Sequence, residues 1–166
     1  MKDELLQLIR HARDTGNWEQ VASLIPYSAV MGFELVEGDG GQPLGVMRFR
    51  PQLVGNPAIP ALHGGAIGSL LESTAASLVL WKTDAVAIPK TVSITMDYFR
   101  PAKALDTYCS GRVTRLGRRV VNVRVEAWQD DRDKPVAAAN ATFLLLPDAS
   151  PASPSLHRLP VRRSSP

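Results

Sequence analysis

One stretch near the middle of the chain, residues 63–81, constrains the fold more than any other segment. Between Gly64 and Trp81 the only ionisable side chain is Glu72; every other residue is apolar, small, or carries a Ser or Thr hydroxyl. This composition predicts a helix that is buried on nearly all sides. Such a helix needs a sheet that wraps it, because no single flat surface can cover all of its faces.

Strand-like segments on both sides of this helix predict that sheet. Two precede the helix and four follow it, and their short links favour antiparallel pairing. The expected strands are residues 32–37, 44–50, 91–99, 107–115, 119–128 and 136–146. The alternation of polar and apolar residues over 91–98 predicts a half-buried strand. Residues 54–62, which contain prolines and a glycine, are expected to form a loop.

The two ends of the chain differ from its middle. Residues 1–26 are expected to form a helical extension, since apolar residues recur at helical spacing from Leu5 to Ala12 and Pro26 would end a second short helix. Residues 27–146 would form one folded domain. The Pro-, Ser- and Arg-rich residues 147–166 are expected to form a disordered tail.

Composition excludes several classes of protein. With 166 residues, of which 45% are hydrophobic, the chain can build one domain with a core. A single cysteine, Cys109, excludes a disulfide framework and a cysteine-rich zinc module. The histidines lie far apart with no ligand pattern around them, so no metal site is expected. No phosphate loop, dinucleotide fingerprint or Gly-x-Ser-x-Gly motif occurs.

The charge distribution argues against a nucleic-acid or membrane partner. Residues 147–166 carry three arginines and one acid, which is +2 of the total net charge of +3, so the rest of the chain is close to neutral. Residues 1–4 include two acids where a secretory signal has a cationic region. The longest uncharged stretch, residues 51–71, is interrupted by prolines and polar residues and cannot span a membrane. We therefore expect a cytoplasmic protein.

Glu72 is the residue at which chemistry is expected. A lone carboxylate in an apolar helix costs several kcal/mol unless it is paired, hydrogen-bonded or protonated. Its neighbours on the same helix face are small and leave room for a backbone or a ligand: Gly65, Gly68, Ser69, Ala75 and Ala76. Glu72 either pairs with an arginine from a strand or is a general base or nucleophile with a raised pKa, in a slot between subunits.

The segment His63–Gly65 opens the same helix. Free N–H groups at a helix N-terminus attract negative charge, and glycines allow a ligand to approach the backbone. An N–H group there could hold the oxyanion that forms when a carbonyl group is attacked. The alternative is a tight entry turn in which His63 only caps or packs.

Taken together, these residues resemble the hotdog-fold acyl-CoA thioesterases, most closely the phenylacetate-degradation type. The resemblance covers about residues 32–146, and it is carried by Asn56, Leu62–Gly65, Glu72, Asp97–Ala102 and the hairpin Arg115–Arg119. It implies an α+β hotdog fold, in which a curved antiparallel sheet of about six strands wraps one long central helix. It also implies a homodimer with a continuous sheet, usually a dimer of dimers, with active sites at the subunit interface.

By this resemblance, Glu72 is the base or nucleophile that acts on the thioester, and the Gly64 N–H is the oxyanion donor, supported by His63. Asn56 would help to place the water or the thioester. Thr91 lies where the family often has a Ser or Thr near the catalytic acid. The spacing from Asn56 to His63 is one residue longer than usual in the family, and many members have Asp at the position of Glu72.

The implied reaction is hydrolysis of an acyl-CoA to the free acid and coenzyme A, with no metal or redox cofactor. Coenzyme A takes part only as a portion of the substrate. Basic residues are expected to hold its phosphates, although each could also be a solvated charge: Arg100, Lys103, Arg115, Arg118 and Arg119. Two alternatives remain open, a non-catalytic hotdog module that binds acyl-CoA as a sensor or scaffold, and a hydratase or dehydratase on the same fold.

Overall fold

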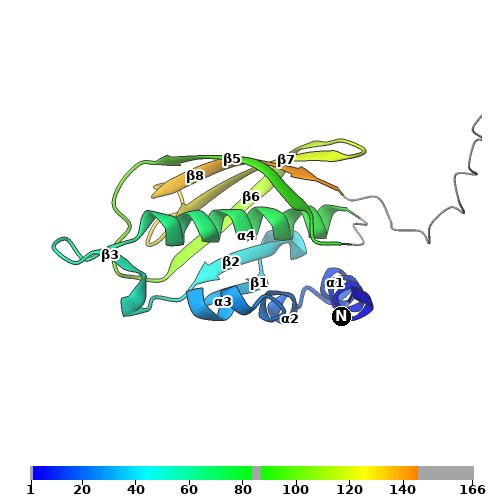
Figure 1. Ribbon diagram of the computed structural model, residues 1–166, viewed down its shortest axis with the longest axis horizontal. Coiled ribbons are helices and arrows are strands. Elements are labelled where there is room, and N and C mark those ends of the chain that lie inside the picture. The colour runs from blue at the N-terminus through cyan, green and yellow to red at the C-terminus, as the bar shows by residue number, and fades with distance from the viewer. Residues whose placement is uncertain (1, 84–86, 146–166) are drawn as a thin grey trace, which may run out of the picture.

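A computed structural model describes residues 2–83 and 87–145 of the chain. Its centre is helix α4 (Gly64–Lys82), which confirms the helix predicted over residues 63–81. A six-stranded sheet curves around this helix in the order β1-β2-β6-β7-β8-β5, with every neighbouring pair antiparallel (Figure 1). This arrangement confirms the α+β hotdog fold.

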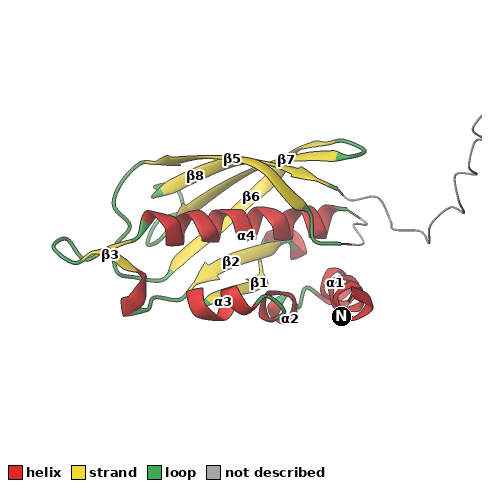
Figure 2. Ribbon diagram, in the orientation of Figure 1, coloured by secondary structure: helices red, strands yellow, loops and turns green. Residues whose placement is uncertain are grey.

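The strands of the sheet agree closely with the predicted segments (Figure 2). They are β1 (Phe33–Glu37), β2 (Pro43–Met47), β5 (Lys90–Tyr98), β6 (Thr107–Leu116), β7 (Val120–Trp128) and β8 (Ala137–Leu144). One-turn 3-10 helices occupy Asp39–Gly41, between β1 and β2, and Pro51–Leu53, after β2.

The core lies between α4 and the concave face of the sheet. Leucines of the helix, among them Leu70, Leu71 and Leu78, are at most 1% exposed and belong to one apolar cluster with residues of β7 and β8. The helix approaches β2 closely because Gly45 has no side chain: a Cβ atom there would overlap Thr74 Oγ1. Burial of the apolar helix is therefore what holds the curled sheet in place.

Three helices precede the sheet: α1 (Lys2–Thr15), α2 (Glu19–Ser23) and α3 (Pro26–Met31). The expectation that Pro26 ends the helical region is wrong, because Pro26 begins α3. A proline fits the first turn of a helix, where its fixed φ is helical and its missing N–H has no intrahelical acceptor. The helical region therefore continues to Met31.

Residues 54–62 are not only a loop. They form a two-stranded hairpin of β3 (Val54–Asn56) and β4 (Ala61–Leu62) beside the entry to α4. The prolines fall between the two strands, so the residues that need a backbone N–H for pairing retain it.

Strands β1 and β5 form the two edges of the sheet. The half-burial predicted for β5 is confirmed only at Ile94 and Met96, which are partly buried against the core, whereas Val92 at 62% and Tyr98 at 53% are exposed. Alternation in sequence predicts burial of the apolar side chains only where another element fully covers that face of the strand. β5 lies at the edge of the sheet and, within the described chain, pairs only with β8. Such an edge can pair with another strand.

The expected tail, residues 147–166, lies outside the described residues. Within residues 2–83 and 87–145, none of the helices combines the length and the apolar character needed to cross a membrane.

A small charged cluster at the surface fixes the end of β2. Asp106 accepts a hydrogen bond from the Phe49 N–H at 2.7 Å and pairs with the Arg48 guanidinium at 3.0 Å. Arg48 also pairs with Glu34 at 2.8 Å. The Phe49 N–H and then Arg48 lower the pKa of Asp106, while Asp106 and Glu34 raise the pKa of Arg48.

Replacing Asp106 by Asn weakens this cluster and is expected to lower the free energy of unfolding at neutral pH. The expected loss is only about 1 kcal/mol, because solvent screens the charges. Folding lowers the pKa of this carboxyl below its ordinary value of 3.8, so the ionised group stabilises the fold above that value. The contribution is lost as the pH falls through the folded-state pKa. Urea unfolding should show a smaller difference in the free energy of unfolding between the wild type and Asp106→Asn at about pH 3 than at neutral pH. An equal difference at both pH values would contradict the assignment.

Candidate active site

Glu72 lies on α4 where the curled sheet leaves the helix partly uncovered. Its side chain is half-buried rather than buried on nearly all sides, because the edges β1 and β5 do not meet over this part of α4. The Thr91 hydroxyl, at the start of β5, donates a hydrogen bond of 2.7 Å to Glu72 Oε1. No lysine or arginine within residues 2–83 and 87–145 forms an ion pair with Glu72. The structural ion pair considered above is therefore absent from this part of the chain.

The Glu72 carboxylate faces a cavity of about 180 Å³ between the two sheet edges. Its walls are mainly apolar and come from α2, β1, α4 and the segment before β5. Thr91 also lines the cavity. A single acidic group on the wall of an apolar cavity is an arrangement that suits a base acting on the polar end of a mostly apolar ligand.

The N-terminus of α4 presents one open N–H group. His63 caps the helix: its Nδ1 accepts a hydrogen bond of 2.9 Å from the Gly65 N–H. The His63 carbonyl accepts from the N–H groups of Ala66 and Ile67. Among the described residues, no acceptor bonds the Gly64 N–H, which shares a peptide unit with that carbonyl. Hydrogen bonds to the carbonyl polarise the unit, so this N–H is suited to hold an anionic oxygen.

Tyr98 holds the same helix entry from β5. Its hydroxyl donates a hydrogen bond of 2.9 Å to the Gly64 carbonyl. Gly64 and Tyr98 also line a second cavity, of about 320 Å³, together with Phe99 and Arg100. Tyr98 belongs to the motif Asp97–Ala102 quoted above, but no role was predicted for it. It lies 34 residues from Gly64 in the sequence, so no local sequence pattern indicates that the two residues are in contact.

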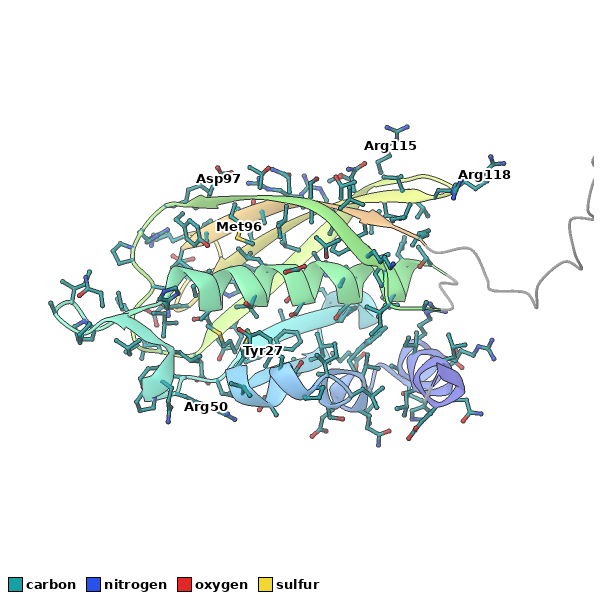
Figure 3. The ribbon with its side chains drawn as sticks, viewed as in Figure 1. Tyr27, Arg50, Met96, Asp97, Arg115 and Arg118 are labelled. Atoms are coloured by element: carbon teal, nitrogen blue, oxygen red, sulfur yellow. The ribbon has the colours of Figure 1, made fainter. Side chains whose placement is uncertain are left out.

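The glycine one turn before Glu72 does not leave room for a ligand. A Cβ atom at Gly68 would lie 2.9 Å from the Met96 sulfur and 3.4 Å from the Tyr98 hydroxyl. Gly68 thus allows side chains of β5 to pack against α4, and Met96 lies beneath β5 toward the helix in Figure 3. The free space beside Glu72 lies on the other side, in the cavity next to Thr91.

Glu72 and Gly64 cannot act together on one carbonyl group within a single chain. Glu72 follows Gly64 by eight residues, about 12 Å along a helix. Their partners Thr91 and Tyr98 are seven residues apart on β5, more than about 20 Å. The carboxylate and the N–H also line different cavities.

Asn56 lies in the β3–β4 hairpin and lines neither of these two cavities. Its side-chain oxygen accepts a hydrogen bond of 3.0 Å from the Ala58 N–H, which is the local bond of an Asx turn. The neighbouring Gly55 packs directly against His63. Within the described part of the chain, the structure therefore places Asn56 near the helix entry and does not bring it to Glu72.

The basic residues expected to hold phosphates are divided between the two ends of the sheet. Arg100 lines the cavity of Gly64, and its guanidinium donates to the Pro135 carbonyl at 3.0 and 3.1 Å. Lys103 lies nearby and pairs with Asp130 at 3.3 Å. Arg118 and Arg119 lie at the β6–β7 hairpin, and Figure 3 shows Arg115 and Arg118 at the end of the sheet away from Asp97. Sequence alone did not show that a full strand separates the two groups.

The comparisons with known proteins agree with this fold. The family model of the thioesterase superfamily matches residues 60–136. A solved structure of a protein from Chromobacterium violaceum is 36% identical, covers 84% of this chain and 97% of its own, and has a TM-score of 0.66. The chain has the hotdog thioesterase fold, and its residues 60–136 match the thioesterase superfamily.

The superfamily match includes Gly64, Glu72 and Thr91, and it excludes the three amino-terminal helices. Medium/long-chain acyl-CoA thioesterase YigI of Salmonella typhimurium is 25% identical over 134 residues, which are 73% of this chain and 86% of YigI. A phenylacetic acid degradation-related protein from Ralstonia eutropha JMP134 is 28% identical, covers 72% of this chain and 89% of its own, and has a TM-score of 0.63. The chain is thus similar both to a curated acyl-CoA thioesterase and to a structure of the type that its motifs resemble.

Proposed function

We propose that the protein hydrolyses acyl-CoA thioesters to the free acid and coenzyme A, with Glu72 as the general base or nucleophile and the Gly64 N–H as the oxyanion donor. One observation carries the proposal: within the described residues, a carboxylate with no cationic partner faces an apolar cavity and is oriented by the Thr91 hydroxyl. The match of residues 60–136 to the thioesterase superfamily and the similarity to YigI support the class of substrate.

In the base route, Glu72 takes a proton from a water molecule as the oxygen of that water bonds to the thioester carbon. The carbonyl oxygen becomes an oxyanion that accepts a hydrogen bond from the Gly64 N–H. The carbon–sulfur bond then breaks, and the proton is returned to the departing thiolate. In the nucleophile route, a Glu72 oxygen bonds to the thioester carbon, and the carbon–sulfur bond breaks to release the coenzyme A thiolate. Water then hydrolyses the resulting mixed anhydride to the free acid and the Glu72 carboxylate, and the proton lost by that water goes to the thiolate. Both routes use only water and groups of this protein.

A complete site then needs two copies of the chain. Because the Gly64 N–H and the Glu72 carboxylate are too far apart in one chain, we expect a second copy to supply one of them. The outer edge of β5, which pairs with no strand among the described residues and exposes Val92 and Tyr98, is the surface on which two copies would join their sheets. Arg100 and Lys103, at the Gly64 end, are then the cations best placed for coenzyme A phosphates.

The test is release of free thiol from a panel of acyl-CoAs that varies chain length and aromatic character. We expect thiol release that is linear in enzyme concentration for at least one class of acyl group. Binding of acyl-CoA by calorimetry without thiol release for any member would contradict the enzyme and support the non-catalytic acyl-CoA-binding module.

Thr91 acts in this proposal as a positioning residue for Glu72. Replacing Thr91 by Val removes the hydroxyl at nearly constant shape and is expected to lower kcat about tenfold, because one hydrogen bond to a charged group is lost. KM is expected to change little, since Thr91 holds the base rather than the coenzyme. Thr91→Ser keeps the hydroxyl and should retain most of the activity. A Val variant with wild-type kcat would contradict this role.

A further inference from the structure

We propose that the cavity beside Glu72 is the acyl-chain pocket of this protein, and that the amino-terminal helices form the wall that sets the length of the acyl group. The inference rests on the proposed function and deepens it, because it names the substrate class by size. It uses residues that lie outside the superfamily match.

The position of the cavity suits an acyl chain. The acid lies at its wall, and the remaining surface is mainly apolar: Val21 and Ala22 from α2, Phe33 and Leu35 from β1, and Leu80 from α4. Each of these five side chains is at most 6% exposed. A thioester attacked at Glu72 would therefore direct its hydrocarbon chain into a space that water fills poorly.

The wall formed by the amino-terminal helices is held at two points. The Arg13 guanidinium donates hydrogen bonds to the carbonyls of Leu80 and Thr83 at the C-terminal end of α4. Trp18, which is fully buried, donates from its indole N–H to the Gly41 carbonyl at 3.3 Å. Figure 1 shows these helices on the side of β1 and β2 away from β5, with α1 at the end where α4 finishes. The wall is thus fixed to both the helix and the sheet.

The volume of the cavity limits the acyl group. An apolar protein cavity of about 150 Å³ accommodates benzene, and this cavity is slightly larger at about 180 Å³. It therefore fits an apolar group of about six to eight carbon atoms, such as a hexanoyl, octanoyl or phenylacetyl group. Two isoleucines at the rim, Ile25 and Ile88, are 40% and 42% exposed and mark where a longer chain would leave the pocket.

The test compares kcat/KM for the saturated acyl-CoAs from acetyl to palmitoyl. Ala22→Leu places a larger side chain in the cavity and should lower kcat/KM for octanoyl-CoA about tenfold or more relative to acetyl-CoA, because each excluded methylene costs about fourfold. Ala29→Leu is the matched control: it makes the same change on α3, at an exposed position outside the cavity. It should leave the octanoyl-to-acetyl ratio as in the wild type.

Ile25→Ala tests the same wall in the opposite direction. Because Ile25 is partly exposed, the variant should fold, and the wider rim should raise the lauroyl-to-octanoyl ratio. Folding of each variant is checked by circular dichroism and thermal melting. Unchanged ratios in folded Ala22→Leu, or in Ile25→Ala if Ala22→Leu does not fold, would overturn the pocket.

Failure of the pocket and failure of the proposed function give different results. If the wild type releases no thiol from any acyl-CoA, the proposed function fails, and the pocket is tested by calorimetry with octanoyl-CoA. Weaker binding by Ala22→Leu than by Ala29→Leu would then support the pocket; equal binding by the two variants would overturn it.

Discussion

Glu72→Gln is expected to lower kcat for acyl-CoA hydrolysis by about 100-fold or more while the protein remains folded. The amide has the shape of the carboxylate, and its oxygen can still accept the hydrogen bond from Thr91, so the cavity and α4 should keep their geometry. It cannot take a proton from water or attack a thioester carbon. Steady-state thiol release, with circular dichroism and thermal melting as checks on folding, measures the effect.

Replacing a second acidic residue distinguishes loss of the reacting carboxylate from a general effect of removing a negative charge. Glu126→Gln removes an acid on β7 whose partner is Arg124, at 3.4 Å, and which does not line the cavity of Glu72. Its activity should match the wild type. Near wild-type turnover in Glu72→Gln would end the assignment of Glu72 as base or nucleophile.

Gly64→Pro is expected to lower kcat by about 100-fold or more by removing a single hydrogen-bond donor, the backbone N–H. The substitution suits the helix, because proline is favoured at the first helical position. His63 has φ −65° and ψ 132°, the extended conformation that a residue before proline adopts. A Cβ atom at Gly64 would lie 3.6 Å from the Tyr98 ring, an ordinary contact. Stability should therefore be preserved while the oxyanion donor is lost.

Gly64→Ala is the matched control, since it adds the same Cβ atom and keeps the N–H. It should retain most of the wild-type kcat. Equal losses in the Ala and Pro variants would show that bulk at this position, rather than the donor, is responsible. Full activity in Gly64→Pro would remove the Gly64 N–H from the mechanism.

Mixing the two inactive proteins tests whether two copies share a site. In a mixed dimer of Glu72→Gln and Gly64→Pro, one site combines the intact Gly64 of one chain with the intact Glu72 of the other. Random exchange of subunits should restore about a quarter of the wild-type activity. No recovery, although mass spectrometry detects mixed dimers, would contradict a shared site.

Strong local patterns made the frame of this fold predictable. The apolar stretch of α4 and the β-branched segments of β6 and β7 have few alternatives, so their positions were predicted to within two residues. Pro26 was misinterpreted because proline both ends helices and begins them, and only the neighbouring backbone decides between the two.

Contacts between distant elements were much less predictable. The burial of Glu72 was overestimated, because an apolar helix does not reveal that two sheet edges leave part of it uncovered. The approach of Thr91 to Glu72 was expected only through the family resemblance. The contributions of α2 to the cavity had no local signal, since Val21 and Ala22 look like ordinary residues of an amphipathic turn.

In this proposal, the reacting groups and the residues that select the acyl group lie in different parts of the chain. The acid and the helix entry belong to α4, whereas the proposed wall of the cavity lies outside it and is held to α4 through Arg13 and to the β1–β2 connection through Trp18. Substitutions before β1 could therefore alter which acyl groups are accepted while the reacting groups stay unchanged. Descendants of such a protein could diversify in substrate range through the residues before β1 while the sequence of α4 stays the same.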